Sequence, residues 1–460
     1  ALTKAMAAED GSAHDDGDDV EEARPLLRDV EVAARAHAAQ RLCWKAAMHD
    51  FDAGFSRACW RSVDIFKGVL VIFMTFAHVN LTLMSPALQL YSPVAHLIGN
   101  VAAGQCFLGF MLAYGFACDG AYFANRKPRG PGEAFLRVAR SCMLPIVGAW
   151  VCMFAWGFMC FKLPMDGPTL LAMLTFRLAV GNGPDFLMCF PVCLLVMFAL
   201  RHIMNRELSS SSLWRRYLCA AVMLLAPLCL TQFVINDCTG LRKYYNYFFE
   251  CNARELWSPN LPALPHLFYF NLGVLLSRAA EAYRSWAKGG GRLEAQVVVP
   301  AYIAATMLLA LLSYPLLTVW VFNYGNLAVA TPWGNVIRGF SGGPSPLWLL
   351  GNLFGVEVVL SLAVALHLFS ERADDSTLSG SAVRAFVSEL EHLGANILLY
   401  LVVADVCLSG LWRGSAGQYP LGLHGGAVAT FGILAGARFL FYLARSGHTT
   451  GAAGSPSKGA

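Results

Sequence analysis

Three ionisable side chains interrupt the apolar segment DIFKGVLVIFMTFAH, which runs from Asp64 to His78. Asp64 and Lys67 are three residues apart, so on a helix they share one face and can form an ion pair. His78 lies about 21 Å of helical rise beyond Asp64. Because an imidazole titrates near neutral pH, it can take a proton from an attacking hydroxyl or amine. We therefore interpret His78 as a general base or a transient acyl acceptor; a neutral histidine packed among helices is the alternative.

Two acidic residues could orient such a histidine, as the acid of a catalytic triad does. Asp405 falls in a predicted helix at a depth similar to that of His78, and Glu357 lies near the middle of another. Ionisable groups at bilayer depth are costly and are functional by default. A proton or substrate relay through His78, Glu357, Asp405 and Arg438 is a second interpretation of the same residues.

Basic residues near the expected start of the third helix could bind phosphate. In FLRVARSCMLP, Arg137 and Arg140 are three residues apart and share one helical face. A guanidinium presents a fork of donors that matches phosphate oxygens. With Asp64 and Lys67, these arginines form the predicted binding site for a phosphate-bearing donor. The alternative is the positive charge that cytoplasmic loops ordinarily carry.

The cysteines and histidines predict no metal site. Most of the 14 cysteines lie inside apolar runs, where a free cysteine behaves as a small hydrophobe. No Cys or His cluster has the spacing of metal ligands. Cys238 and Cys251 share one polar loop, so a disulfide can form there if that loop faces an oxidising compartment.

The composition is that of a membrane protein. The chain has 460 residues, of which 57% are hydrophobic and 14% charged, and its mean hydropathy is +0.51. Ordinary soluble domains carry roughly a quarter charged residues. The net charge of +4 gives no reason to expect nucleic-acid binding.

The apolar runs predict an all-α, polytopic fold of about ten transmembrane helices. A spanning helix needs about 20 mostly apolar residues. Ten segments meet this length or approach it: 62–84, 95–117, 141–161, 184–203, 216–236, 265–282, 297–322, 346–370, 388–410 and 423–445. The segment 164–183 is too interrupted to span, so we expect a re-entrant or interfacial element there.

The distribution of Lys and Arg predicts that both termini are cytoplasmic. Fifteen basic residues fall in the connections on one side of the expected helices and seven on the other. Cytoplasmic loops carry the excess of positive charge. This orientation puts Asp64 and Lys67 near the cytoplasm, His78 toward the opposite side, and the loop with Cys238 and Cys251 outside.

The two ends of the chain differ from its apolar middle. We expect a disordered acidic arm at 1–58, a transmembrane domain at 59–446 and a disordered tail at 447–460, because the ends lack apolar content. Within the arm, EARPLL at 22–27 has the acidic-xxx-Leu-Leu form of endosomal and lysosomal sorting signals. We therefore expect a multi-pass protein of the endosomal, lysosomal or plasma membrane.

The first predicted helix resembles that of the acyltransferase family 3 membrane proteins. Members share an Asp-x-x-Arg/Lys-Gly start followed by a histidine, and Asp64, Lys67, Gly68 and His78 fit this pattern. Four later stretches resemble family helices in the same order: FLGFMLAYGF (107–116), FLRVARSCMLP (135–145), PALPHLFYFNLGVLLSR (262–278) and HLGANILLYLVVAD (392–405). The lysosomal heparan glucosaminide N-acetyltransferases are similar relatives.

The resemblance implies an acyltransferase. Family members move an acyl group, often acetyl, from a cytoplasmic donor to hydroxyls of carbohydrates or lipids beyond the membrane, and the N-acetyltransferases act on an amine. The resemblance implies that His78 is the essential histidine. It also implies that acyl-coenzyme A, with acetyl-coenzyme A expected, is a co-substrate rather than a bound cofactor. Three positions depart from the family pattern. Tyr114 and Ile397 each replace a family serine, and Ala404 falls about where the family has a late histidine.

Three functions are therefore open at this point. The first is an acyltransferase whose partners are acyl-coenzyme A, a carbohydrate or lipid acceptor and the bilayer. The second is a transporter of a small polar solute, and the third is a non-catalytic relative in which His78 is dispensable. A homodimer is compatible with each of them.

Overall fold

The computed structural model is helical wherever it describes the chain. Its described residues are 58–80, 82–84, 92, 103–124, 130–176, 183–234, 263–288, 308, 346–374, 376–415 and 420–452. Within these ranges there is no strand, only an isolated β-bridge between Met84 and Leu421. The all-α prediction is confirmed for this part of the chain. The chain divides into two units, Ala1–Ala58 and Cys59–Ala460, and the second contains every helix described below.

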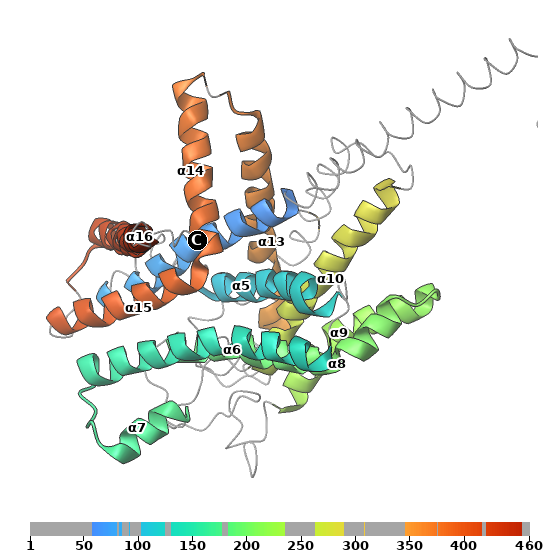
Figure 1. Ribbon diagram of the computed structural model, residues 1–460, viewed down its shortest axis with the longest axis horizontal. Helices are drawn as coiled ribbons and strands as arrows, with labels where there is room; N and C mark the ends of the chain where they lie inside the picture. Colours follow the sequence, from blue (N-terminus) through green and yellow to red (C-terminus); the bar gives the residue numbers. More distant parts are fainter. Residues whose placement is uncertain are drawn as a thin grey trace, which may run out of the picture. The chain divides into compact units, whose positions relative to one another are not determined.

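Figure 1 shows the helices coloured in chain order. After the first helix, Ala58–Asn80, they are α5 (Ala103–Cys118), η2 (Asp119–Phe123), α6 (Pro131–Phe154), η3 (Ala155–Cys160), α7 (Gly167–Leu174), α8 (Gly183–Leu208), α9 (Leu213–Val234), α10 (Ala263–Lys288), α13 (Pro346–Arg372), α14 (Leu378–Ala395), α15 (Ile397–Gly414) and α16 (Leu423–Ala452). Both η elements are single π-helical turns that continue the preceding α-helix.

Seven of the described helices are long and apolar enough to cross a membrane, so the chain is a multi-pass membrane protein. These seven are Ala58–Asn80, Gln105–Phe123, Gly132–Cys160, Leu187–Leu208, Asn352–Arg372, Ile397–Gly414 and Leu423–Leu443. The predicted helices at 216–236 and 265–282 exist as α9 and α10 but are not among the seven. The predicted helix 297–322 and the Cys238–Cys251 loop lie outside the described residues. The count of ten is therefore not confirmed.

Two predicted helices have different bounds. The third was expected at 141–161, but α6 begins at Pro131, with proline at its first position and Glu133 in its first turn. Both features favour a helix start there. The ninth was expected as one helix, 388–410, and is instead divided at Asn396 into α14 and α15. The Asn396 side chain donates to the His392 carbonyl at 2.9 Å, and such local side-chain bonds compete with the helical ladder.

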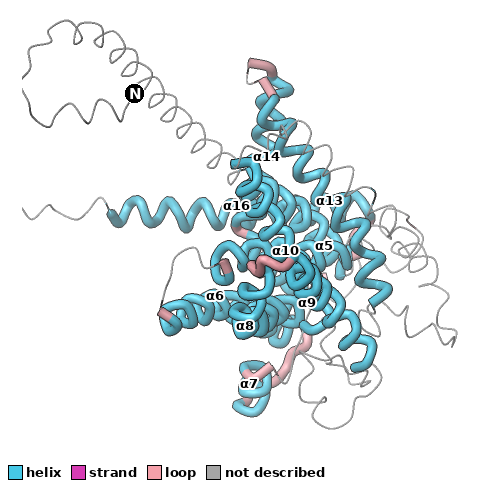
Figure 2. The backbone as a smooth tube through the Cα atoms, turned by 90° about the vertical axis from the view of Figure 1, so that its right-hand side faces the viewer, coloured by secondary structure: helices cyan, strands magenta, loops and turns pink. Residues whose placement is uncertain are grey.

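The elements at 164–183 and at the C-terminus also differ from simple spans. The described part of 164–183 forms the eight-residue α7, as expected of a segment that does not span (Figure 2). Asp166 begins it by accepting a hydrogen bond from the Thr169 N–H at 2.8 Å. Interactions with the Thr169 side chain and then with its backbone N–H lower the pKa of the Asp166 carboxyl. Helix α16 continues to Ala452, past the predicted boundary at 446.

Glycines allow the first helix and α14 to approach within backbone contact. A Cβ added to Gly68 would lie 2.0 Å from the Leu390 carbonyl oxygen, and one added to Gly394 would lie 1.8 Å from that of Asp64. A second crossing of this kind joins α5 and α10 through Gly115. Helices in membranes associate closely where small residues face each other. The glycine after Lys67 is therefore a packing residue.

We expect Gly68→Ala and Gly394→Ala each to destabilise the protein by on the order of 1–3 kcal/mol, because the added methyl group meets backbone atoms that cannot move alone. Thermal unfolding in detergent would measure the loss. Gly432→Ala and Gly436→Ala are matched controls on α16, where nothing lies within 4 Å of an added Cβ. Equal melting temperatures for all four variants would contradict the close crossing.

Candidate functional site

His78 lies near the end of the first helix, and its imidazole has no hydrogen-bond partner among the described residues. Its side chain is partly buried, and its carbonyl oxygen accepts a hydrogen bond from the Thr82 hydroxyl at 2.6 Å. No described residue hydrogen-bonds its ring nitrogens. An imidazole with an uncommitted lone pair can accept a proton. The local structure therefore permits the role that the sequence predicts.

Residues next to His78 and Asp405 pack in one small apolar cluster, which we call the distal cluster. Its buried members are Val79, Leu83, Trp156, Ala404, Leu408 and Ile433. They come from the first helix, η3, α15 and α16. The cluster thus brings the neighbourhoods of the two predicted catalytic residues together. Among the described contacts, however, no hydrogen bond or ion pair joins His78 to Asp405.

Asp405 is buried without a hydrogen-bond partner. Its side chain projects from α15, is 2% exposed as a residue, and neither carboxyl oxygen is bonded. The Trp156 indole of η3 and the Cys152 thiol of α6 lie next to this carboxyl but do not reach ordinary hydrogen-bond geometry. A buried polar group without a partner is costly, so it is retained mostly for function.

Glu357 lies in a different part of the bundle. It is 8% exposed on α13, its Oε2 has no partner, and its neighbours Val356 and Val359 belong to the main apolar core. Tyr269 of α10 lies close enough to interact with the Glu357 charge, and its hydroxyl donates to the Leu349 carbonyl at 2.7 Å. The structure thus does not bring Glu357 into the distal cluster, and its catalytic role stays a prediction.

The residues of the predicted donor site fall into two groups. Lys67 Nζ lies 2.6 Å from Asp64 Oδ1, so the expected ion pair is confirmed. Arg137 and Arg140 are exposed along the first turns of α6, and the Arg137 guanidinium lies 5.4 Å from the centre of the Tyr122 ring. No described contact joins these arginines to Lys67. Their assembly around a phosphate group stays a prediction.

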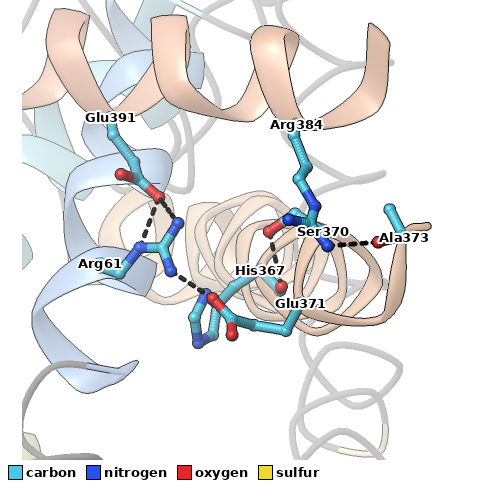
Figure 3. Close-up of polar contacts among 7 residues, drawn as sticks. All are labelled: Arg61, His367, Ser370, Glu371, Ala373, Arg384 and Glu391. Atoms are coloured by element: carbon cyan, nitrogen blue, oxygen red, sulfur yellow. Dashed lines mark hydrogen bonds and ion pairs between the residues drawn. The ribbon is translucent and has the colours of Figure 1, made fainter. Parts of the chain in front are cut away.

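Arg61 connects the first helix to α13 and α14 (Figure 3). Its guanidinium lies 2.7 Å from Glu391 Oε1 and forms a second ion pair with Glu371. His367 of α13 lies close to the same charges. Sequence reasoning missed this cluster because its partners are more than 300 residues apart. The only signal in the sequence was weak: opposite charges lie at helix ends that were expected on the same side of the membrane.

Arg438, a predicted relay residue, is held by α14. Its guanidinium donates to His392 Nε2 and lies 3.2 Å from Glu389. Because a guanidinium only donates, Nε2 must accept, and the ring proton lies on Nδ1, 3.1 Å from the Tyr400 hydroxyl. Arg438 therefore joins α16 to the break between α14 and α15.

An ion pair with a buried carboxylate joins η2 to α10 and extends to α8, and nothing in the sequence indicated it. Arg278 Nε lies 2.8 Å from Asp119 Oδ1, and the same guanidinium donates to Asn205 Oδ1 at 2.7 Å. The Asn205 amide then donates to the Phe123 carbonyl at 2.8 Å. Asp119 is 2% exposed, so its charge depends on this network.

Comparison with known proteins adds no family, because no family model and no curated protein matches the chain. The acyltransferase hypothesis therefore depends on the sequence motifs and on the geometry above. Within the described ranges, no group of three His, Cys, Asp or Glu side chains could hold a metal ion.

Removing one member of the Asp119–Arg278 pair should destabilise the protein by about 3 kcal/mol, because the remaining charge loses its buried counter-ion. We expect Asp119→Asn to lower the unfolding temperature, and Asp374→Asn, at an exposed loop position, to leave it unchanged. The double variant Asp119→Asn/Arg278→Gln should lose less than the sum of the two single losses. A strictly additive double-mutant cycle would contradict the pairing.

Proposed function

We propose that the protein is an integral membrane acyltransferase. It moves an acyl group, acetyl expected, from cytoplasmic acyl-coenzyme A to a hydroxyl or amine of a carbohydrate or lipid acceptor on the other side. The observation that carries this proposal is His78, whose imidazole no described residue hydrogen-bonds. It lies on the same helix as Asp64 and Lys67, beside a cluster that also contains the neighbour of the buried Asp405.

The chemistry assigned to His78 is general-base catalysis. The acceptor oxygen or nitrogen attacks the thioester carbonyl carbon while the imidazole takes its proton. The carbon–sulfur bond then breaks, and coenzyme A leaves as a thiolate that takes up a proton. A positioned base of this kind accelerates transfer roughly 100- to 10,000-fold. In the acyl-carrier variant, an imidazole nitrogen of His78 holds the acyl group before the acceptor does.

The donor enters from the side where the basic residues lie. The excess of Lys and Arg supports cytoplasmic termini, so Lys67, Arg137 and Arg140 face a cytoplasmic donor. The two arginines are exposed and free to bind phosphate oxygens. The EARPLL segment supports an endosomal or lysosomal membrane, with the plasma membrane as the alternative.

We expect His78→Ala to abolish transfer of label from acetyl-coenzyme A to extracted glycans or lipids, because the base is lost. Alanine at this position leaves the helix intact. His202→Ala on α8, an exposed histidine, is the matched control and should transfer normally. Both variants should insert into membranes at wild-type levels. Retained transfer by His78→Ala would reject His78 as the base, and the absence of transfer by the wild-type protein would favour a non-catalytic relative. Label on His78 itself would select the acyl-carrier mechanism.

A second function, transport of a small polar solute, is favoured by one observation. Asp405 and Glu357 are buried acids in helices able to span a membrane, and each has at least one carboxyl oxygen without a partner. Such groups mark proton or substrate pathways in transporters. Uptake of a labelled solute into proteoliposomes without acyl donor, lost in Asp405→Asn and Glu357→Gln, would select transport over transfer.

A further inference from the structure

Two buried polar groups of opposite kind lie next to each other where α15 packs against η3. Asp405 is 2% exposed and offers two carboxyl oxygens, and Trp156 is 6% exposed and offers one indole N–H. Neither the oxygens nor the indole nitrogen has a hydrogen-bond partner of ordinary geometry. The indole N–H lies close enough to the carboxyl to interact with it but forms no hydrogen bond of ordinary geometry, so each group can still bond a third one.

Two neighbouring polar groups of this interface have hydrogen-bond partners. The Ser409 hydroxyl donates to the Val406 carbonyl at 2.7 Å, and the Cys160 thiol donates to the Ser409 carbonyl at 3.2 Å. Asp405 and Trp156 differ from these two neighbours in having polar atoms without a partner. Buried polar groups are almost always paired in folded proteins, so an open pair of opposite kind indicates a ligand.

The backbone around Trp156 is also irregular. Trp156 lies in η3, a π-helical turn that ends the long helix begun by α6. Such turns occur frequently at functional sites, because the extra residue widens the helix and redirects its side chains. Trp156 belongs to the distal cluster with Val79, the residue after His78.

We propose that Asp405 and Trp156 bind a hydroxyl group of the acceptor. A hydroxyl donates one hydrogen bond and accepts others, so one group satisfies both the carboxyl oxygen and the indole N–H. An ammonium group only donates, so it would leave the indole N–H facing a positive charge. This inference rests on the proposed function, because that function names the ligand as the acceptor. The proposed function allows a hydroxyl or an amine as the acceptor group, and the inference selects the hydroxyl.

Binding can be tested without any transfer reaction. Radiolabelled n-octyl β-D-glucoside serves as the probe on the full-length protein in lipid nanodiscs. We expect saturable binding that unlabelled glucoside displaces and that octylammonium chloride does not. Displacement by octylammonium as effective as by the glucoside would overturn the hydroxyl assignment, and so would the absence of saturable binding to the wild-type protein.

Conservative variants locate the binding site. Trp156→Phe removes only the indole N–H, and Asp405→Asn keeps the size of the side chain, so each should weaken glucoside binding at least tenfold. Trp150→Phe and Asp374→Asn are matched controls and should bind as the wild type does. Trp150 uses its indole on the Leu174 carbonyl, and Asp374 accepts from the Ser376 N–H. Unchanged binding in both site variants would overturn the proposal.

The binding result separates this inference from the proposed function. Binding that depends on Asp405 and Trp156 supports the inference even if acetyl-coenzyme A donates no acyl group, in which case the proposed function fails alone. Transfer that depends on His78, with unchanged glucoside binding and an unchanged acceptor KM in both site variants, overturns the inference and leaves the proposed function standing.

Discussion

The backbone contact between the first helix and α14 is the constraint on which the candidate site depends. Gly68 faces the Leu390 carbonyl and Gly394 faces that of Asp64, so neither helix can slide or rotate without a clash. This crossing fixes the register of the first helix against α14 and places Arg61 beside Glu391, near the end that also carries the local Asp64–Lys67 pair. At the other end, the same helix carries His78, about 21 Å of rise from Asp64, and its neighbour Val79 belongs to the distal cluster.

Charge is distributed unequally between these two regions. Near the crossing, Arg61, Lys67 and Arg438 each pair with a carboxylate, as Arg278 does with Asp119 elsewhere in the bundle. Asp405 and Glu357 lack any ion pair within the described part of the chain. Paired charges cost less to bury and mainly hold helices together, whereas an unpaired buried carboxyl invites a proton or a ligand. We therefore expect a proton or a ligand to bind at Asp405 and Glu357 rather than at the arginine clusters.

Apolar run length predicted the helical class and the positions of most described helices, because about 20 apolar residues in a row leave few other structures possible. It failed where single side chains decide the local structure, as at Asn396, whose amide competes for a backbone carbonyl and divides α14 from α15. The i, i+3 pair of Asp64 and Lys67 was predictable because it is local. The Arg278–Asp119 pair was not, since hydropathy carries no information on which distant helices meet.

The orientation of Asp405 bears on how His78 works. A triad acid must hydrogen-bond the imidazole that it orients, yet the Asp405 carboxyl lies against Trp156 and Cys152 from the α6–η3 segment. The triad interpretation thus lacks its central contact among the described residues. We expect the Asp405 carboxyl to hold the acceptor rather than to orient the His78 imidazole. Positioning the nucleophile is itself a large catalytic effect, because a correctly held hydroxyl reacts as though present at very high effective concentration. Under the proposed function, we therefore expect Asp405 to contribute by binding the acceptor and His78 to accept the proton without an acid partner.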